Sequence, residues 1–287
     1  MPVTSRAERR LQLTAAAYSI PGGGRAIGAL RTVLGAGQDA WDVLWGRGHP
    51  DLTPPRRLAY VGGGDFHDTG REFLTYFRDL GQLVPDDDVL DIGCGSGRMA
   101  VPLTTYLGPH SRYEGFDVIA AGINWCQSNI SPRFPSFHFR TIDAFSERYN
   151  PTGSTARQAY RFPYDGGSFD FVFATSVFTH LLPDVMHDYI VEVGRVLRPG
   201  GRLFATFFLT NSHNQVSHGL RPLLTFQHGG PGYRAVTRRA PEVAIGYDEA
   251  EVAATLMDNG LRIIETEYGT WTGGPGLTYQ DVLVASK

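Results

Sequence analysis

The sequence predicts an α/β fold with a parallel sheet that is buried on both faces. Apolar runs and helical patterns alternate along the chain from residue 88 onward, which is typical of strand–helix–strand units with a parallel sheet. The apolar runs are nearly continuous, as expected of strands covered on both sides. The first run passes directly into a turn with glycine at alternate positions, Gly93, Gly95 and Gly97. This arrangement predicts a ligand site at the end of the first strand.

The chain ahead of the sheet predicts helices and loops. Alanine-rich spacing indicates a helix over 5–18. Residues 25–45 are expected to be helical in two short pieces that break near Gly35 and Gly37. Apolar residues at helical spacing predict an amphipathic helix over 71–80.

The remaining elements follow from the alternation itself. Helices that separate strands are bounded by turn residues, and the third of them is expected to stop at Pro199-Gly200-Gly201. The long stretch 210–247 breaks the pattern and predicts an insertion after the fifth strand. The expected strands are 88–92, 113–117, 136–140, 169–175, 202–208, 261–267 and 279–285, and the expected helices are 97–107, 119–129, 184–197 and 248–259.

Composition and charge narrow the function classes. The chain has 287 residues, of which 42% are hydrophobic and 19% charged, as in an ordinary globular protein. The net charge of −3 gives no global attraction to nucleic acid or to an anionic membrane, and we expect neither as a partner. The two cysteines, Cys94 and Cys126, are too few for a disulfide framework or a four-cysteine zinc site. Without an apolar leader or spanning run, we expect a cytoplasmic protein.

The glycine turn indicates the chemistry of the ligand. Glycines adopt positive φ and let a ligand approach the backbone closely. A dinucleotide fingerprint, G-x-G-x-x-G, would need glycine where this chain has Arg98, which argues against a nicotinamide cofactor.

The run from Asp91 to Gly97 resembles motif I of the class I S-adenosylmethionine-dependent methyltransferases, D-x-G-x-G-x-G. The resemblance covers about residues 70–287 and is closest in kind to bacterial small-molecule enzymes. It implies a Rossmann-like, seven-stranded, mostly parallel sheet with helices on both faces and the last strand antiparallel between the fifth and sixth. It also implies S-adenosylmethionine as cofactor, with its amino-acid end wrapped by the motif. The motif residues are Asp91, Gly93, Cys94, Gly95 and Gly97.

Further cofactor contacts are expected at the ends of the next strands. Asp117 ends the second strand, where an acidic side chain accepts the hydroxyls of a ribose. By the resemblance, Val118 packs on the adenine, Asp143 accepts its amino group and the Ala144 backbone N–H meets a ring nitrogen. Thr175 ends the fourth strand and faces the same crevice.

His180 is the candidate catalytic residue. In the segment 175–180 that follows the fourth strand, it is the only good proton acceptor. An imidazole of ordinary pKa, ~6.5, can serve as a general base. A structural histidine is the alternative. His180 could also form a metal site with Asp184, His187 and Asp188. Polar residues exposed at the start of a helix explain the same pattern more simply, so no metal is expected.

These observations predict two parts and one activity. Residues 1–82 form a helical and loop extension that we expect to act as a lid, and 83–287 form the cofactor-binding domain with the insertion 210–247. The activity is methyl transfer to a small-molecule acceptor, with oxygen favoured as the accepting atom over the alternatives nitrogen and carbon. A protein or peptide methyltransferase, a non-catalytic cofactor-binding module and a nicotinamide dehydrogenase remain as alternatives. Methylation of a nucleic-acid base is disfavoured, because Thr175 to Phe178 replace the [DNS]-P-P-[YFW] tetrad of those enzymes.

Overall fold

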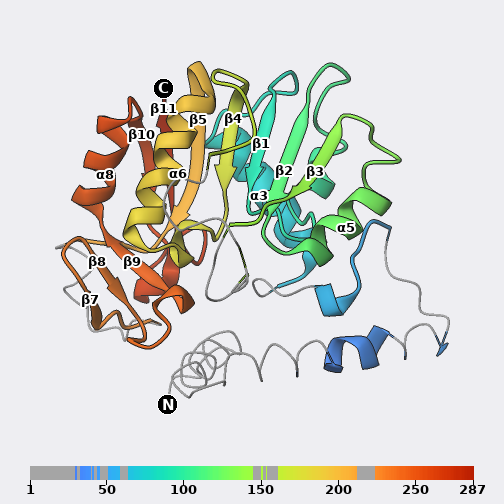
Figure 1. Cartoon of the computed structure of the whole chain (residues 1–287), viewed down its shortest axis with the longest axis horizontal. Coiled ribbons are helices and arrows are strands. Elements are labelled where there is room, and N and C mark those ends of the chain that lie inside the picture. The colour runs from blue at the N-terminus through green and yellow to red at the C-terminus, as the bar shows by residue number, and fades with distance from the viewer. Residues whose placement is uncertain are drawn as a thin grey trace.

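The main sheet has seven strands in the order β10-β11-β5-β4-β1-β2-β3 (Figure 1). The computed structural model of the chain describes residues 30, 33–39, 41, 44–45, 51–58, 64–144, 150, 153, 161–211 and 224–287. The strands are β1 (Val89–Ile92), β2 (Tyr113–Asp117), β3 (Phe137–Thr141), β4 (Phe169–Ala174), β5 (Leu197–Phe207), β10 (Arg262–Glu267) and β11 (Asp281–Ser286). The first five run parallel, and β11 is antiparallel to both β5 and β10. The expected seven-stranded topology is confirmed.

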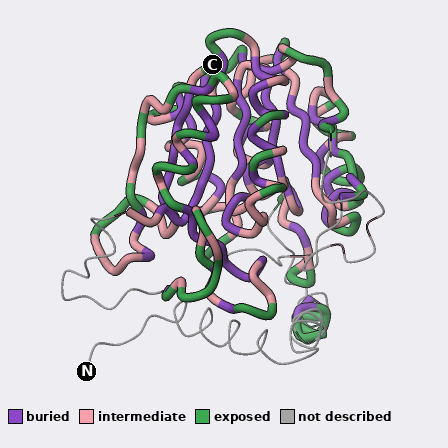
Figure 2. Tube along the Cα trace, turned by 60° about the vertical axis from the view of Figure 1, so that its left-hand side comes forward, coloured by how far each residue is buried: buried purple, intermediate pink, exposed green. Residues whose placement is uncertain are grey.

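Helices cover both faces of this sheet. They are α3 (Phe66–Asp79), α4 (Ala100–Leu103), α5 (Ala120–Asn129), α6 (Pro183–Val196) and α8 (Glu249–Asp258). Alternate residues of β4 show the two layers. Phe171 and Phe173 pack with Phe77 of α3, whereas Val172 and Ala174 belong to the cluster that includes α6 and α8. Figure 2 shows the burial concentrated along the strands between these layers.

The helix expected at 71–80 begins earlier, at Phe66, because Asp65 caps it. The Asp65 carboxylate accepts hydrogen bonds from the backbone N–H groups of His67 and Asp68. Gly70 lies inside this helix and is buried. A Cβ atom there would lie 2.6 Å from the carbonyl oxygen of Arg98, so the missing side chain allows α3 to approach the segment that follows the glycine turn.

The helix expected at 97–107 is wrong in length, because only Ala100–Leu103 is α-helical, with turns on either side. Pro102 lies within it and has no N–H to donate to the Arg98 carbonyl. The site therefore has a tight turn at the end of β1 and no long helix behind it.

Two further expectations change in detail. Strand β5 begins at Leu197 and includes Pro199-Gly200-Gly201, although α6 ends where predicted. The break near Gly35 and Gly37 is wrong, because both lie within the helical residues 33–39. A Cβ at Gly35 would lie 2.8 Å from the Arg57 nitrogen, so this glycine permits a close backbone approach. The helix expected at 5–18 lies outside the described residues.

The insertion after β5 forms a second, four-stranded sheet in the part of it that is described. Its strands are β6 (Leu209–Thr210), β7 (His228–Gly230), β8 (Tyr233–Ala235) and β9 (Ile245–Asp248), in the order β6-β9-β8-β7. Phe208, Leu224, Ala244 and Trp271 pack together beside it. Figure 1 places this sheet at the end of the main sheet where the parallel strands terminate.

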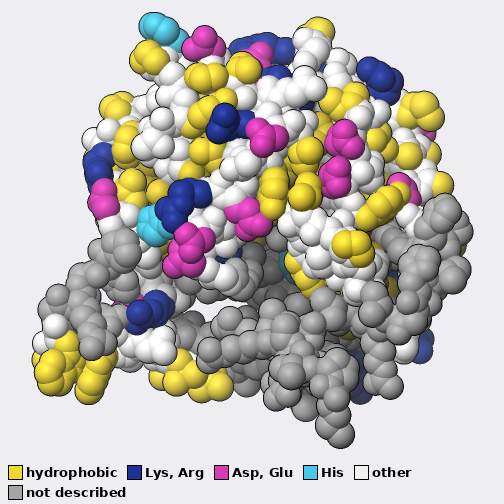
Figure 3. Space-filling model, turned by 180° about the vertical axis from the view of Figure 1, so that it is seen from behind, with side chains coloured by type: hydrophobic (Ala, Val, Ile, Leu, Met, Phe, Trp, Pro, Cys, Tyr) yellow, Lys and Arg dark blue, Asp and Glu magenta, His cyan; other side chains and the backbone are white. Residues whose placement is uncertain are grey.

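The described N-terminal residues lie at the same end of the molecule (Figure 1). The Asp39 carboxylate accepts the Arg56 N–H at 2.9 Å, which ties the helical residues 33–39 to η1 (Arg56–Leu58). Asp51 pairs with both terminal nitrogens of Arg133 just past α5, at 2.6 and 2.9 Å. Figure 3 shows hydrophobic side chains gathered over this N-terminal segment. None of the described helices is long and apolar enough to cross a membrane.

Candidate functional site

The glycine turn after β1 is held against the end of β2. Gly93, Gly95 and Gly97 all have positive φ, at 75°, 56° and 81°. The N–H groups of Gly93 and Cys94 donate to the Phe116 carbonyl at 2.9 and 3.1 Å. A Cβ at Gly95 would meet nothing within 4 Å, so this glycine borders open space. The turn thus presents bare backbone at the carboxyl end of the sheet.

Asp117 fixes this turn from the next strand. One oxygen of its carboxylate accepts the Gly95 N–H at 2.8 Å, and the other accepts the Ile119 N–H at 2.8 Å. Burial raises the pKa of Asp117, while these backbone donors lower it. Each carboxylate oxygen can accept a second hydrogen bond, so the side chain retains capacity for ligand hydroxyls.

Asp91 is a buried carboxyl group at the start of the turn. It is 1% exposed, and its Oδ2 accepts the Tyr113 hydroxyl at 2.6 Å. Burial raises its pKa to about 8, the Tyr113 hydrogen bond lowers it, and the nearby Asp117 raises it further. Its Oδ1 is buried without a hydrogen-bond partner among the described residues. A buried, unsatisfied carboxylate oxygen fits a cationic ligand group such as an ammonium, which supplies both a proton donor and a compensating charge.

The adenine-side residues expected from the sequence lie at the ends of the neighbouring strands. Asp117 stands opposite Thr141 in the β2–β3 register, and Val118 follows it, half-buried. Asp143 is exposed and Ala144 is buried. The Asn150 side chain donates to the Asp143 carboxylate at 3.3 Å and to the Ala144 carbonyl at 3.1 Å, so one amide spans both residues.

The segment after β4 packs against the glycine turn. Thr175 is half-buried, and Ser176 has a positive φ of 58°. The Val177 side chain lies over Gly93 so closely that a Cβ there would be 2.5 Å from Val177 Cγ2. The His180 N–H donates to the Val177 carbonyl at 2.9 Å. His180 is therefore linked to the turn through Val177.

His180 itself ends η2 (Phe178–His180) and is half-buried. Its Nδ1 lies 2.9 Å from the Glu242 carbonyl oxygen, which comes from η3 (Pro241–Val243) in the insertion. A carbonyl only accepts, so Nδ1 carries the proton and Nε2 is the basic nitrogen of the neutral ring. The Tyr247 hydroxyl donates to the Leu181 carbonyl at 2.6 Å and holds the same segment from β9.

The structure thus brings most predicted residues to one end of the sheet. Hydrogen bonds or close packing join Gly93, Cys94, Gly95 and Asp117 with the segment that carries His180. Asp143 and Ala144 lie one strand further out. Sequence reasoning missed the residues whose hydrogen bonds fix Asp91, His180 and the segment after β4. These residues are Tyr113, Ser176, Thr206, Glu242 and Gln280. Of these, Tyr113 had a detectable signal, because it begins the strand that ends in Asp117.

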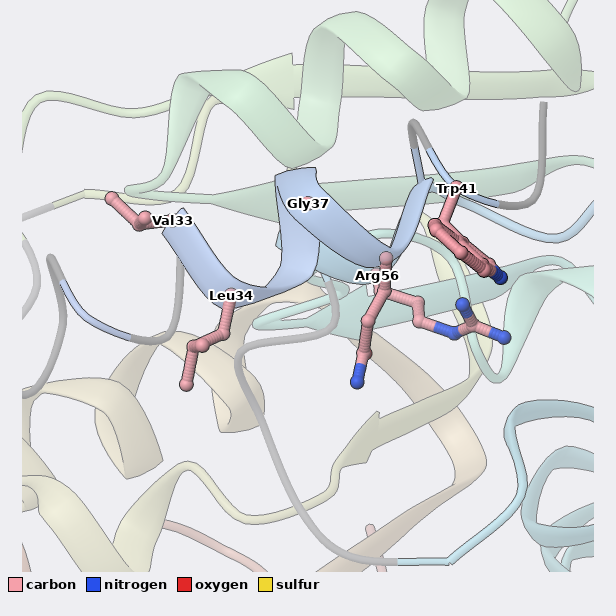
Figure 4. Close-up of a pocket in the computed structure, with 6 residues that line it drawn as sticks. Val33, Leu34, Gly37, Trp41 and Arg56 are labelled. Atoms are coloured by element: carbon pink, nitrogen blue, oxygen red, sulfur yellow. The ribbon is translucent and has the colours of Figure 1, made fainter. Parts of the chain in front are cut away.

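A separate hollow of about 610 Å³ lies on the N-terminal segment (Figure 4). Apolar side chains from the helical residues 33–39 and from Trp41 line it, with Arg56 from η1 beside them. Its lining residues are Val33, Leu34, Gly37, Gln38, Trp41 and Arg56. None of them belongs to the glycine turn or to the segment after β4. Across the described part of the chain, no group of three or more His, Cys, Asp or Glu could hold a metal ion.

Residues 90–205 match the family model described as a methyltransferase domain. The chain is 30% identical over 184 residues to the 27-O-demethylrifamycin SV methyltransferase of Amycolatopsis mediterranei (strain S699). This alignment covers 61% of this chain and 58% of that protein. It is 35% identical over 115 residues to the phthiotriol/phenolphthiotriol dimycocerosates methyltransferase of Mycobacterium leprae (strain TN), covering 40% of this chain and 35% of that protein. Both alignments span less than two thirds of the relative.

A solved structure agrees in fold. The PH0226 protein from Pyrococcus horikoshii OT3 superposes with a TM-score of 0.53 at 14% identity, over 79% of this chain and 93% of that one. At this identity the likeness supports the architecture alone.

We expect Asp91 to make the ligand-free protein less stable as the pH rises. The carboxyl has a pKa of about 8 when folded and about 3.9 when unfolded, so between these values the folded state keeps a proton that the unfolded state releases. The stability from this proton is complete below about pH 4 and is lost as the pH rises through about 8, by up to about 1.4 kcal/mol per unit.

Asp91→Asn keeps an oxygen for the Tyr113 hydroxyl and cannot ionise, so it should lack this loss. Urea unfolding of both proteins from about pH 5 to about pH 8 measures the difference. The exposed Asp79→Asn is the control and should follow the wild type. Parallel stability curves for wild type and Asp91→Asn would show that Asp91 does not titrate as described.

Proposed function

We propose that this chain, which belongs to the class I S-adenosylmethionine-dependent methyltransferase family, methylates a small molecule at an oxygen atom. The observation that carries the proposal is the glycine turn, which Asp117 holds open next to the buried carboxyl of Asp91. The relative from Amycolatopsis, by its name, acts on a 27-O-demethylrifamycin, and this supports oxygen as the accepting atom. Because the alignments cover only part of each relative, the acceptor is proposed on the chemistry of the site.

The residues at this edge fit the cofactor group by group. Asp91 Oδ1 would accept from the ammonium group, and the open backbone at Gly95 admits the amino-acid portion. Asp117 would accept the ribose hydroxyls. Val118, Asp143 and Ala144 would flank the adenine, and Cys94, Gly97 and Thr175 would line the remaining wall. When bound, S-adenosylmethionine supplies an electrophilic methyl group on a sulfonium sulfur.

His180 would hold the proton that leaves the acceptor. With Nδ1 bonded to the Glu242 carbonyl, Nε2 is the basic nitrogen and takes the hydroxyl proton as the acceptor oxygen becomes nucleophilic. Alignment of the acceptor contributes a large share of the rate in addition, since it removes the entropy of bringing two molecules together.

Residues 1–82 and the insertion 210–247 would form the walls of the acceptor site around the domain 83–287. Within the extension, α3 packs into the core through Phe77, which is 1% exposed, so the covering part would be the segment ahead of α3. The described residues of that segment lie at the carboxyl end of the sheet in Figure 1, and among them Leu34 is 58% exposed and Trp41 is 57% exposed. The same residues carry the hollow of about 610 Å³ described above. An apolar face of this kind fits an acceptor with a substantial hydrocarbon portion.

S-adenosylhomocysteine, the product form of the cofactor, should stabilise the protein, and NAD should not. At about 100 times its Kd, a ligand that binds only the folded state adds about 2.7 kcal/mol to the free energy of unfolding. Thermal unfolding with each compound measures this effect. A rise in Tm with NAD and none with S-adenosylhomocysteine would contradict the proposal.

Two glycine variants sharpen this test. Gly93→Ala and Gly95→Ala both place a Cβ at positive φ, but only the Gly93 Cβ would collide with Val177. Gly95→Ala should therefore mainly weaken the binding of S-adenosylhomocysteine, whereas Gly93→Ala should mainly lower the stability of the protein. Equal affinity of wild type and Gly95→Ala would remove the turn from the binding site.

His180→Ala should lower kcat by about 10² to 10⁴ and leave the affinity for S-adenosylhomocysteine nearly unchanged. The loss should be largest below the pKa of the acceptor hydroxyl and shrink above it, where the acceptor ionises without a base. Label transfer from methyl-labelled S-adenosylmethionine to acceptors in fractionated cell extract, followed by mass spectrometry, would identify the acceptor for pH–rate profiles. A variant with wild-type kcat at every pH would rule out His180 as the base.

A further inference from the structure

Ser176 has a backbone conformation that its side chain does not favour. Its φ of 58° lies in the left-handed region, and among the described residues other than glycine only Leu52 and Gln82 share a positive φ. This conformation is unfavourable for an L-residue with a Cβ. Ser176 stands two residues beyond the end of β4, between Thr175 and Val177. A strained residue at this position needs surrounding contacts that hold it.

Two side chains from β5 and from the residue before β11 supply those contacts. The Ser176 N–H donates to Thr206 Oγ1 at 2.7 Å, and the Thr206 hydroxyl donates to Gln280 Oε1 at 2.6 Å. The Ser176 hydroxyl donates to the same Gln280 oxygen at 3.1 Å. Thr206 is fully buried. The Thr206 hydroxyl and the Gln280 amide oxygen thus satisfy both hydrogen-bond donors of Ser176.

Gln280 is itself fixed by the next residue. The Asp281 carboxylate accepts the backbone N–H groups of Leu209 and Gly269 at 2.6 and 2.7 Å, and the Trp271 Nε1–H at 2.8 Å. Asp281 is fully buried. These donors come from two separate parts of the chain, Leu209 and the segment Gly269–Trp271, so the start of β11 is anchored on both and Gln280 with it.

The conformation of Ser176 sets the position of the residues that follow. Val177 lies on Gly93, and its carbonyl accepts the His180 N–H at 2.9 Å. If Ser176 relaxed to negative φ, the chain direction after β4 would change and Val177 would leave the glycine turn. The contact with the turn and the placement of His180 therefore depend on the same residue.

We propose that Thr206 and Gln280 are positioning residues, which hold Ser176 in the left-handed conformation so that Val177 closes the glycine turn and His180 stays beside it. This inference rests on the proposed function, because it assigns the network to the cofactor site. Thr206 in β5 and Gln280 just ahead of β11 are not among the motif residues, yet they thereby control the geometry of a site that lies earlier in the chain.

The test compares Thr206→Val with Thr206→Ser. Valine has nearly the same shape but lacks the hydroxyl, so Ser176 N–H and Gln280 Oε1 both lose a partner. Serine keeps the hydroxyl. Calorimetric titration with S-adenosylhomocysteine, well below the melting temperature, should show affinity about tenfold or more weaker for Thr206→Val. Thr206→Ser should bind within about twofold of the wild type.

Gln280→Met is the second variant, because it removes the amide at a half-buried position with little change in length. It should weaken binding in the same direction even if Thr206→Val fails to fold. If the variants lower Tm but bind like the wild type, or if Thr206→Ser loses as much affinity as Thr206→Val, the positioning role is overturned. If the wild type does not bind S-adenosylhomocysteine, the proposed function fails, which is a separate result.

Discussion

The carboxylate of Asp117 is the interaction on which this site depends. It accepts one N–H from the glycine turn after β1 and one from the segment that leads to α5. A single side chain thus fixes the position of one loop relative to the other. Without that acceptor, the N–H of the half-buried Gly95 would lose its hydrogen-bond partner at a residue already at positive φ. The carboxylate stays at this end of the sheet because parallel strands direct their carboxyl ends to one edge, where the backbone is no longer paired.

Asp91 and Asp117 lie beside the same turn, so ionising both carboxyl groups there is unfavourable unless a cationic ligand group binds. Asp91 is buried with one oxygen unsatisfied, and Asp117 raises its pKa. A cation next to Asp91 would favour the ionised form and remove both costs together. The segment after β4 lies on the other side of the glycine turn. There Val177 lies on Gly93, and the insertion holds His180 through the Glu242 carbonyl. The insertion and the C-terminal strand therefore complete what the motif begins.

The sheet and the turn were predictable because their signals are local. Continuous apolar runs mark β1 and β4, and glycine spacing marks the turn. Local reasoning failed where distant contacts decide. Pro102 shortened the expected helix, and the Arg57 backbone explains Gly35 inside a helix. Part of the expected insertion 210–247 pairs into a sheet that its sequence did not predict. Ser176 and Gln280 meet across more than a hundred residues, so no window of sequence could link them.

The most direct measurement is the affinity of Asp117→Asn for S-adenosylhomocysteine, by calorimetry against the wild type. Asparagine keeps the shape and one accepting oxygen but loses the charge and the second acceptor. The loss of one charge-assisted hydrogen bond, about 1.5–3 kcal/mol, predicts affinity weaker by about tenfold to a hundredfold. The exposed Asp79→Asn should bind like the wild type. An Asp117→Asn protein that is folded and binds within about twofold of the wild type would contradict the account.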